Sequence, residues 1–182
     1  MREHELKTYE GYDEEYIFER NDSIISKLVY KYGITDKQDV IDCADRLFDY
    51  VIKSAYELLD GHHQYTASEL FVSRGSKCPT VVINNRLKTS VGALHILERK
   101  IDLSGDLIRY GTLHDVVATL LHELAHAAFR IHTVLRHGND GDLIFESLLY
   151  KIGADPGGIK LRGSGNFPVE VYRTGRRCWY HY

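Results

Sequence analysis

Residues 112–127 read TLHDVVATLLHELAHA, and this stretch decides how the rest of the chain is interpreted. Its apolar residues recur every three or four positions, which predicts a helix. Thr112 is followed three positions later by Asp115, which resembles a capping box and places a negative charge near the positive end of the helix dipole. We therefore expect a helix that opens at Gly111 and Thr112 and runs to about Leu135.

The end of this stretch, residues 122–126, reads HELAH and has the HExxH spacing. Residues four apart lie on one helix face, separated by ~6 Å along the axis, so the imidazoles of His122 and His126 can bind one Zn²⁺. Glu123 lies beside them, where its carboxylate can take a proton from a water that the metal makes acidic. The apolar residues occupy the other face, so we expect the histidines to point away from the main core. The pattern predicts a zinc hydrolase with Glu123 as general base.

A catalytic zinc site has three protein ligands, so the sequence must supply one more. We favour His137, because it lies in a polar loop, precedes Gly138 and stands where the chain turns back between two helices. Glu146, on the next helix, is the second candidate. His132 is the third, but the metzincin pattern that would use it requires a glycine where this chain has Phe129.

The remaining periodicity predicts an α+β domain in the order helices, small sheet, helices. We expect a short helix from Ser23 to Gly33 and a long one that opens with a capping box at Thr35 and Gln38 and continues to Leu58 and Leu59. The segment 1–21 is charged and rich in tyrosine, and we consider both a flexible arm and a folded element for it. Short β-prone runs, expected to form a mostly antiparallel sheet, lie at residues 70–72, 80–83, 91–97 and 101–103, and a last helix is expected from Leu143 to Gly153.

The composition is that of one ordinary globular domain spanning 1–182. Hydrophobic residues make up 43% of the 182 residues and charged residues 27%, values close to globular averages. No apolar run approaches the ~18 residues that a membrane helix needs, and the acidic N-terminus is unlike a leader peptide, so we expect a cytoplasmic protein with no membrane contact. Cys43, Cys78 and Cys178 lack CxxC spacing, which predicts reduced thiols.

Charge is distributed unevenly along the chain. Residues 1–60 carry 8 basic and 15 acidic side chains, whereas residues 156–182 carry 5 basic side chains and a single acidic one, Glu170. Within the tail 154–182, arginines interleave with aromatic residues, which suits contact with single-stranded DNA. The other interpretation is a basic closing strand that packs against the acidic N-terminal helices. The candidate DNA-contacting residues are Arg173, Arg176, Arg177 and Trp179.

Two histidines outside the motif are further candidates. His114 lies two turns before His122 on the same predicted helix, and His95 lies on a predicted strand. Either could reach the cleft and donate a hydrogen bond to a metal ligand or to the reacting group. The alternative is that both are simply half-buried histidines.

Together these motifs resemble the SprT-like metallopeptidases, a family that includes bacterial SprT proteins and the eukaryotic Spartan protease. The resemblance spans about residues 80–153. Gly138 and Phe145 are seven positions apart here, whereas the family usually places them three apart. The tail has only Cys178 and His181 for the C-terminal zinc ribbon that many members carry, so the ribbon is absent or degenerate. The matching segments are Asn84 to Leu87, Val91-Gly92, Ile101 to Ser104, His122 to Ala127, His137-Gly138 and Phe145.

The resemblance implies a zincin-like fold of the minigluzincin type and a zinc-dependent endopeptidase that acts on DNA-associated proteins. Two other functions stay open. One is hydrolysis of a non-peptide amide, because HExxH determines how water is activated and not which substrate is cleaved. The other is a DNA- or protein-binding module with a structural zinc, although a structural site has no use for Glu123.

Overall fold

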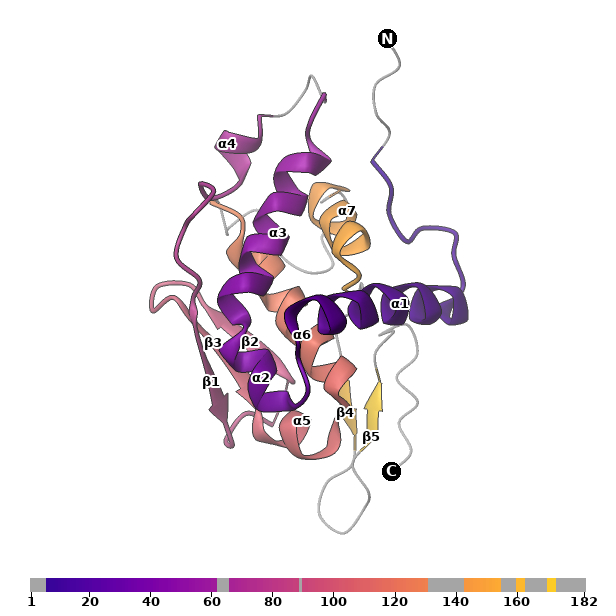
Figure 1. Cartoon of the computed structure of the whole chain (residues 1–182), viewed down its shortest axis with the longest axis vertical. Helices are drawn as coiled ribbons and strands as arrows, with labels where there is room; N and C mark the ends of the chain where they lie inside the picture. Colours follow the sequence, from indigo (N-terminus) through magenta and orange to yellow (C-terminus); the bar gives the residue numbers. More distant parts are fainter. Residues whose placement is uncertain are drawn as a thin grey trace.

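The computed structural model describes residues 6–61, 66–88, 90–130 and 143–154, together with the backbone of residues 160–162 and 170–172. Within these ranges the chain is α+β, as the sequence predicts, with several helices around a small sheet (Figure 1). The helices are α1 (Glu14–Tyr32), α2 (Lys37–Asp42), α3 (Ala44–Leu58), α4 (Ala67–Leu70), α5 (Gly105–Tyr110), α6 (Leu113–Ala127) and α7 (Leu143–Ile152). The strands are β1 (Thr80–Asn84), β2 (Gly92–His95), β3 (Lys100–Ser104), β4 (Lys160–Arg162) and β5 (Glu170–Tyr172).

The main sheet has three strands in the order β1-β3-β2. β2 pairs with β3 in the antiparallel direction, whereas β1 pairs with β3 in parallel. The prediction of a mostly antiparallel sheet is therefore wrong for one of the two pairings. β2 and β3 form a hairpin. β3 is the central strand of the sheet, and on its other edge it pairs with β1, which runs in the same direction. The run 70–72, predicted as a strand, does not form one. Leu70 is the last residue of α4, and Phe71 makes an isolated bridge to Phe129.

The N-terminal helix is longer than expected. α1 starts at Glu14, where the side chain of Asp13 caps the backbone N–H of Tyr16, and Ile17 is buried. Residues 14–21 are thus helical, and the arm considered from the sequence does not extend past Asp13. The helix ends where predicted, because Gly33 takes the left-handed conformation that a helix C-cap favours.

The next helical region is divided where one helix was expected. α2 opens with a capping box between Asp36 and Asp39, one residue later than the predicted Thr35 and Gln38. Thr35 still contributes, since its backbone N–H and its hydroxyl both donate to the carboxylate of Asp39. Cys43 leaves the helical conformation, with φ −96° and ψ 10°, and separates α2 from α3.

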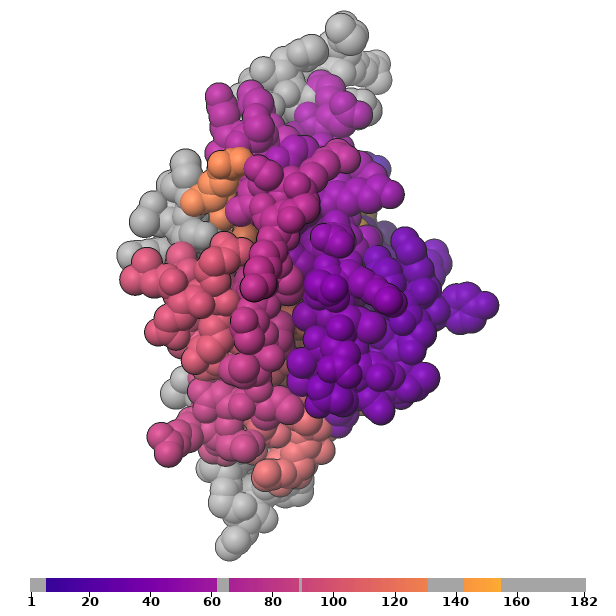
Figure 2. Space-filling view, turned by 60° about the vertical axis from the view of Figure 1, so that its left-hand side comes forward, coloured from indigo at the N-terminus to yellow at the C-terminus, as the bar shows by residue number. Residues whose placement is uncertain are grey.

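α6 lies at the centre of the packing. It contacts α3 as well as β2 and α7, and most of its residues are buried, including Asp115, Thr119 and His122. The expectation that the histidines point away from the core is therefore wrong for His122, whereas His126 and Glu123 are half-buried. Figure 2 shows the pink segment that leads into β1 lying beside the indigo and purple N-terminal helices.

Two global features follow from the described residues. None of their helices is both long and apolar enough to cross a lipid bilayer. Cys43 and Cys78 are free thiols, and burial raises the pKa of Cys78 to about 12, so this thiol stays protonated at neutral pH. Cys178 lies outside the described residues.

Candidate functional site

The helix that carries the motif begins as its sequence predicts. The hydroxyl of Thr112 accepts from the backbone N–H of Asp115 at 3.1 Å, and the carboxylate of Asp115 accepts from the backbone N–H of Thr112 at 2.8 Å. The helix ends at Ala127, earlier than the predicted Leu135. It stops there because the backbone of residues 128–130 pairs with residues 70–72, with Val72 donating to Ala128 and Arg130 donating to Leu70.

The two motif histidines lie together. The ring centroids of His122 and His126 are 5.2 Å apart, with an angle of 66° between the ring planes. His122 is buried and His126 is half-buried. Imidazoles one helical turn apart are ligands that zinc prefers, so this part of the site fits the metal that the motif implies.

Phe145 of α7 packs against both imidazoles. Its ring stacks on that of His126, with centroids 4.4 Å apart, and meets His122 edge-on at 6.0 Å. A buried aromatic ring in this position limits the rotamers of both histidines. From the sequence, Phe145 was identified only as part of the family pattern, and nothing there indicated this contact.

Glu123 reaches the edge of the sheet. The residue as a whole is half-buried, and its carboxylate accepts a hydrogen bond from the backbone N–H of Leu94 in β2. Burial raises the pKa of Glu123 to about 7, and the Leu94 N–H opposes that rise. A carboxyl group with such a pKa can both take up and release a proton near neutral pH, which is what a general base that later acts as an acid requires.

Gly92 allows α6 to lie very close to β2. A Cβ atom at this position would lie 2.9 Å from Cγ2 of Thr119 and 3.1 Å from Cγ of Glu123. Only glycine therefore fits between the strand and the helix without a shift of one against the other. From the sequence, Gly92 was noted through the family pattern, without this steric role.

The other two candidate histidines, His95 and His114, contact carboxylates other than that of Glu123. Nε2 of His95 lies 3.0 Å from Oδ2 of Asp102, on the opposite side of the strand from Leu94, because successive strand residues alternate faces. Nδ1 of His114 lies 2.6 Å from Oδ1 of Asp22 in α1. Neither contact involves Glu123.

The third metal ligand is not located by the described residues. His132 and the favoured His137 lie outside them, and Glu146 is an exposed residue of α7. Within the described ranges, no three His, Cys, Asp or Glu side chains gather closely enough to hold a metal ion. His137 as third ligand stays a prediction from the sequence.

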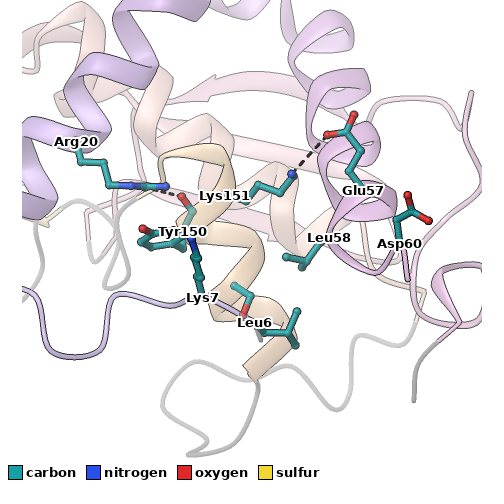
Figure 3. A pocket seen from close by; sticks show the side chains of 9 residues that line it. Leu6, Lys7, Arg20, Glu57, Leu58, Asp60, Tyr150 and Lys151 are labelled. Atoms are coloured by element: carbon teal, nitrogen blue, oxygen red, sulfur yellow. Dashed lines mark hydrogen bonds and ion pairs between the residues drawn. The ribbon is translucent and has the colours of Figure 1, made fainter. Parts of the chain in front are cut away.

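A cavity of about 410 Å³ lies on another face of α7 and contains no motif residue. Figure 3 shows Arg20 donating to the backbone carbonyl of Tyr150 and Lys151 paired with Glu57 along its wall. Tyr150 and Lys151 line this cavity, whereas Phe145 of the same helix contacts His126. The cavity and the motif are therefore separate features.

The tail forms a two-stranded antiparallel ribbon in its described part, with β4 paired to β5. The predicted DNA-contacting residues Arg173, Arg176, Arg177 and Trp179 all lie outside the described residues. The structure therefore places none of them relative to the motif.

A comparison with protein-family models matches residues 61–172 to the SprT-like family, which is more than half of the chain. No curated protein and no solved structure matches the chain. The matched segment contains β1, β2 and β3 as well as α6 and α7, and so includes the two histidines, Glu123, Gly92 and Phe145. The chain belongs to the SprT-like family.

Proposed function

We propose that this chain is a zinc-dependent endopeptidase in which His122, His126 and His137 hold the metal and Glu123 is the general base. The observation that carries the proposal is the arrangement on one turn of α6, where two imidazoles 5.2 Å apart flank a carboxylate held by a backbone N–H of the sheet. When bound, zinc supplies a Lewis acid that polarises the scissile carbonyl and acidifies a water. The assignment of His137 rests on the sequence.

Each side chain then has a defined task. Glu123 takes a proton from the attacking water and delivers it to the nitrogen of the leaving amine, so that one carboxyl group serves both halves of the reaction. The N–H of Leu94 keeps the carboxylate pointing towards the strand edge. Phe145 limits the motion of the His122 and His126 rings, which favours simultaneous binding of both to one ion.

The outer edge of β2 supports a peptide substrate. Val91 accepts from the backbone N–H of Ser104 at 2.8 Å, and because antiparallel pairing alternates, Ala93 and His95 also direct their backbone groups at β3. Gly92 and Leu94 consequently direct theirs outwards, where the N–H of Leu94 meets Glu123. No described strand pairs with that edge. An extended peptide can add there as a further strand, with its backbone beside the general base.

A small non-peptide amide would have no use for this edge, because it has no chain of N–H and C=O groups to pair with it. Digestion of protein and small-amide substrates in parallel separates the two functions.

Association of the substrate with DNA is a further part of the proposal, and it rests on the composition of the tail. We expect added single-stranded DNA to increase cleavage of a DNA-binding protein.

The first experiment is elemental mass spectrometry of the purified protein together with its Glu123→Gln variant. We expect about one zinc per chain in both proteins, since three protein ligands suffice to hold it. Cleavage of a denatured protein substrate should be lost in the variant. A variant that cleaves as fast as the natural chain would overturn the proposal, and so would a natural chain that takes up no zinc on titration.

A further inference from the structure

The hairpin that joins β2 to β3 presents two large aliphatic side chains to solvent. Leu97 is 100% exposed and Ile96 is 46% exposed. Both follow directly on the strand that meets Glu123, with Leu94 only three positions before Leu97. A fully exposed leucine makes no contribution to the core, so its role in this fold is not packing.

The shape of the turn does not depend on these two side chains. Arg99 has φ 49°, a left-handed conformation that residues other than glycine rarely adopt. Its backbone N–H donates to Ile96 at 3.3 Å, its carbonyl accepts from Thr80 at 3.0 Å, and its guanidinium donates to the carbonyl of Lys77 at 2.6 Å. These hydrogen bonds fix the backbone of the turn that carries Leu97.

The turn is within reach of a peptide bound beside Glu123. A strand rises by ~3.3 Å per residue, so Leu97 lies at most ~10 Å from Leu94, about three residues of extended chain. A peptide that follows the outer edge of β2 from Gly92 towards the hairpin passes Ile96 and Leu97 after that distance. One extended peptide is therefore long enough to contact both the edge of β2 and the turn.

We propose that Ile96 and Leu97 form an apolar subsite that selects substrates with a large aliphatic or aromatic side chain three to four residues from the scissile bond. This inference rests on the proposed function and adds its substrate preference. Glu98, Arg99 and Lys100 around the turn carry both signs of charge, and Lys100 is paired with Glu98 at 3.7 Å, so the surroundings do not select for one charge. Burial of Leu97 against the substrate supplies the selectivity.

The test uses quenched fluorescent peptides in which leucine is replaced by aspartate at each position in turn. For the natural chain we expect one position, three to four residues from the cleaved bond, where the replacement lowers kcat/KM roughly tenfold. In Leu97→Ser that preference should disappear, while cleavage of the aspartate peptide is unchanged. Tyr30→Ser is the matched control, because Tyr30 is 90% exposed on α1 and lies on another element. Both variants should keep the melting temperature of the natural chain.

Peptide affinity, measured by fluorescence anisotropy with the inactive Glu123→Gln protein, separates the two proposals. If the natural chain cleaves the peptides and the preference for leucine over aspartate survives in Leu97→Ser, the subsite is overturned and the endopeptidase proposal stands. No cleavage, together with tighter binding of the leucine peptide that depends on Leu97, overturns the endopeptidase and supports Ile96 and Leu97 only as an apolar peptide-binding site. If neither cleavage nor Leu97-dependent binding is seen, both are overturned. An equal loss for leucine and aspartate peptides in Leu97→Ser also overturns the subsite.

Discussion

Glu123 and Asp102 are two carboxyl groups beside the same small sheet, and their surroundings give them opposite properties. Burial would raise the pKa of Asp102, but hydrogen bonds from Asn84 and His95 and the charge of Lys100 outweigh it and hold that pKa below its ordinary value. Glu123 receives one backbone hydrogen bond, from Leu94, and burial raises its pKa to about 7. Burial therefore dominates at Glu123, whereas at Asp102 the donors and the charge of Lys100 together outweigh it.

The largest effect that follows from this comparison is on turnover. Glu123→Gln keeps the size of the side chain and removes its ability to take up a proton, so we expect kcat to fall by ~10²–10⁴-fold. Stability should be unchanged or slightly higher, because a carboxyl group that burial destabilises has been removed. Rates of peptide cleavage and urea unfolding curves measure the two quantities. A variant that unfolds more easily while cleaving normally would reverse the roles assigned to Glu123 and Asp102.

A smaller effect should come from the contact that brings Glu123 to the strand. Gly92→Ala places a Cβ atom 2.9 Å from Cγ2 of Thr119 and 3.1 Å from Cγ of Glu123. We expect a loss of about 1–3 kcal/mol of unfolding free energy from overpacking, and a fall in kcat of up to ~10²-fold if Glu123 moves by about 1 Å.

The matched control for Gly92→Ala is the double variant with Thr119→Ser, which removes the methyl group that the new Cβ would meet. Its hydroxyl can still donate to the carbonyl of Asp115, as that of Thr119 does at 2.9 Å. Part of the lost stability should return. If Gly92→Ala alone matches the natural chain in both measurements, the close approach of α6 to β2 does not limit the site.

α6 and β2 also show which features the sequence could predict and which it could not. The start of α6 and the pairing of His122 with His126 depend on residues within four positions of each other, and the sequence predicted both. The contact of Leu94 with Glu123 joins residues 29 positions apart (123 − 94) on different elements, and no local pattern contains it. The end of α6 was missed for the same reason, since it depends on pairing with residues 70–72.

The histidines show a related limit. Spacing correctly predicted that the rings of His122 and His126 lie together, because two side chains one turn apart are on the same side of a helix, while their binding of a metal stays a prediction. His95 and His114 carried no spacing signal, and their partners Asp102 and Asp22 could be found only once β3 and α1 were placed. Likewise, helical periodicity shows which face of α6 is apolar, but not that His122, on the polar face, is buried.

Asp102→Asn should affect stability and leave catalysis almost intact. The carboxylate accepts from Asn84 at 2.9 Å, lies 3.0 Å from His95 and 3.5 Å from Nζ of Lys100, and is buried. Loss of its charge weakens hydrogen bonds worth about 1.5–3 kcal/mol each, so we expect a loss of about 2 kcal/mol in urea unfolding. Asp106→Asn is the control, because its pairing with the exposed Lys88 at 2.9 Å should contribute less than about 1 kcal/mol.

The smallest expected effect is the pH dependence of that same group. The pKa of Asp102 is lowered by folding from an ordinary value of 3.8, so its charge adds stability at pH values above 3.8, and this contribution is lost as the pH falls through the folded-state pKa. Over most of the accessible pH range the loss should be smaller than that caused by Asp102→Asn, because the lowered pKa keeps part of the charge in place until the pH is well below 3.8. Urea unfolding of the natural chain and of Asp102→Asn between pH 7 and the acid limit of folding measures the difference. The two curves should converge as the pH falls below 3.8. A constant gap across that range would show that Asp102 is not stabilised by its charge, and the contrast with Glu123 would then rest on packing alone.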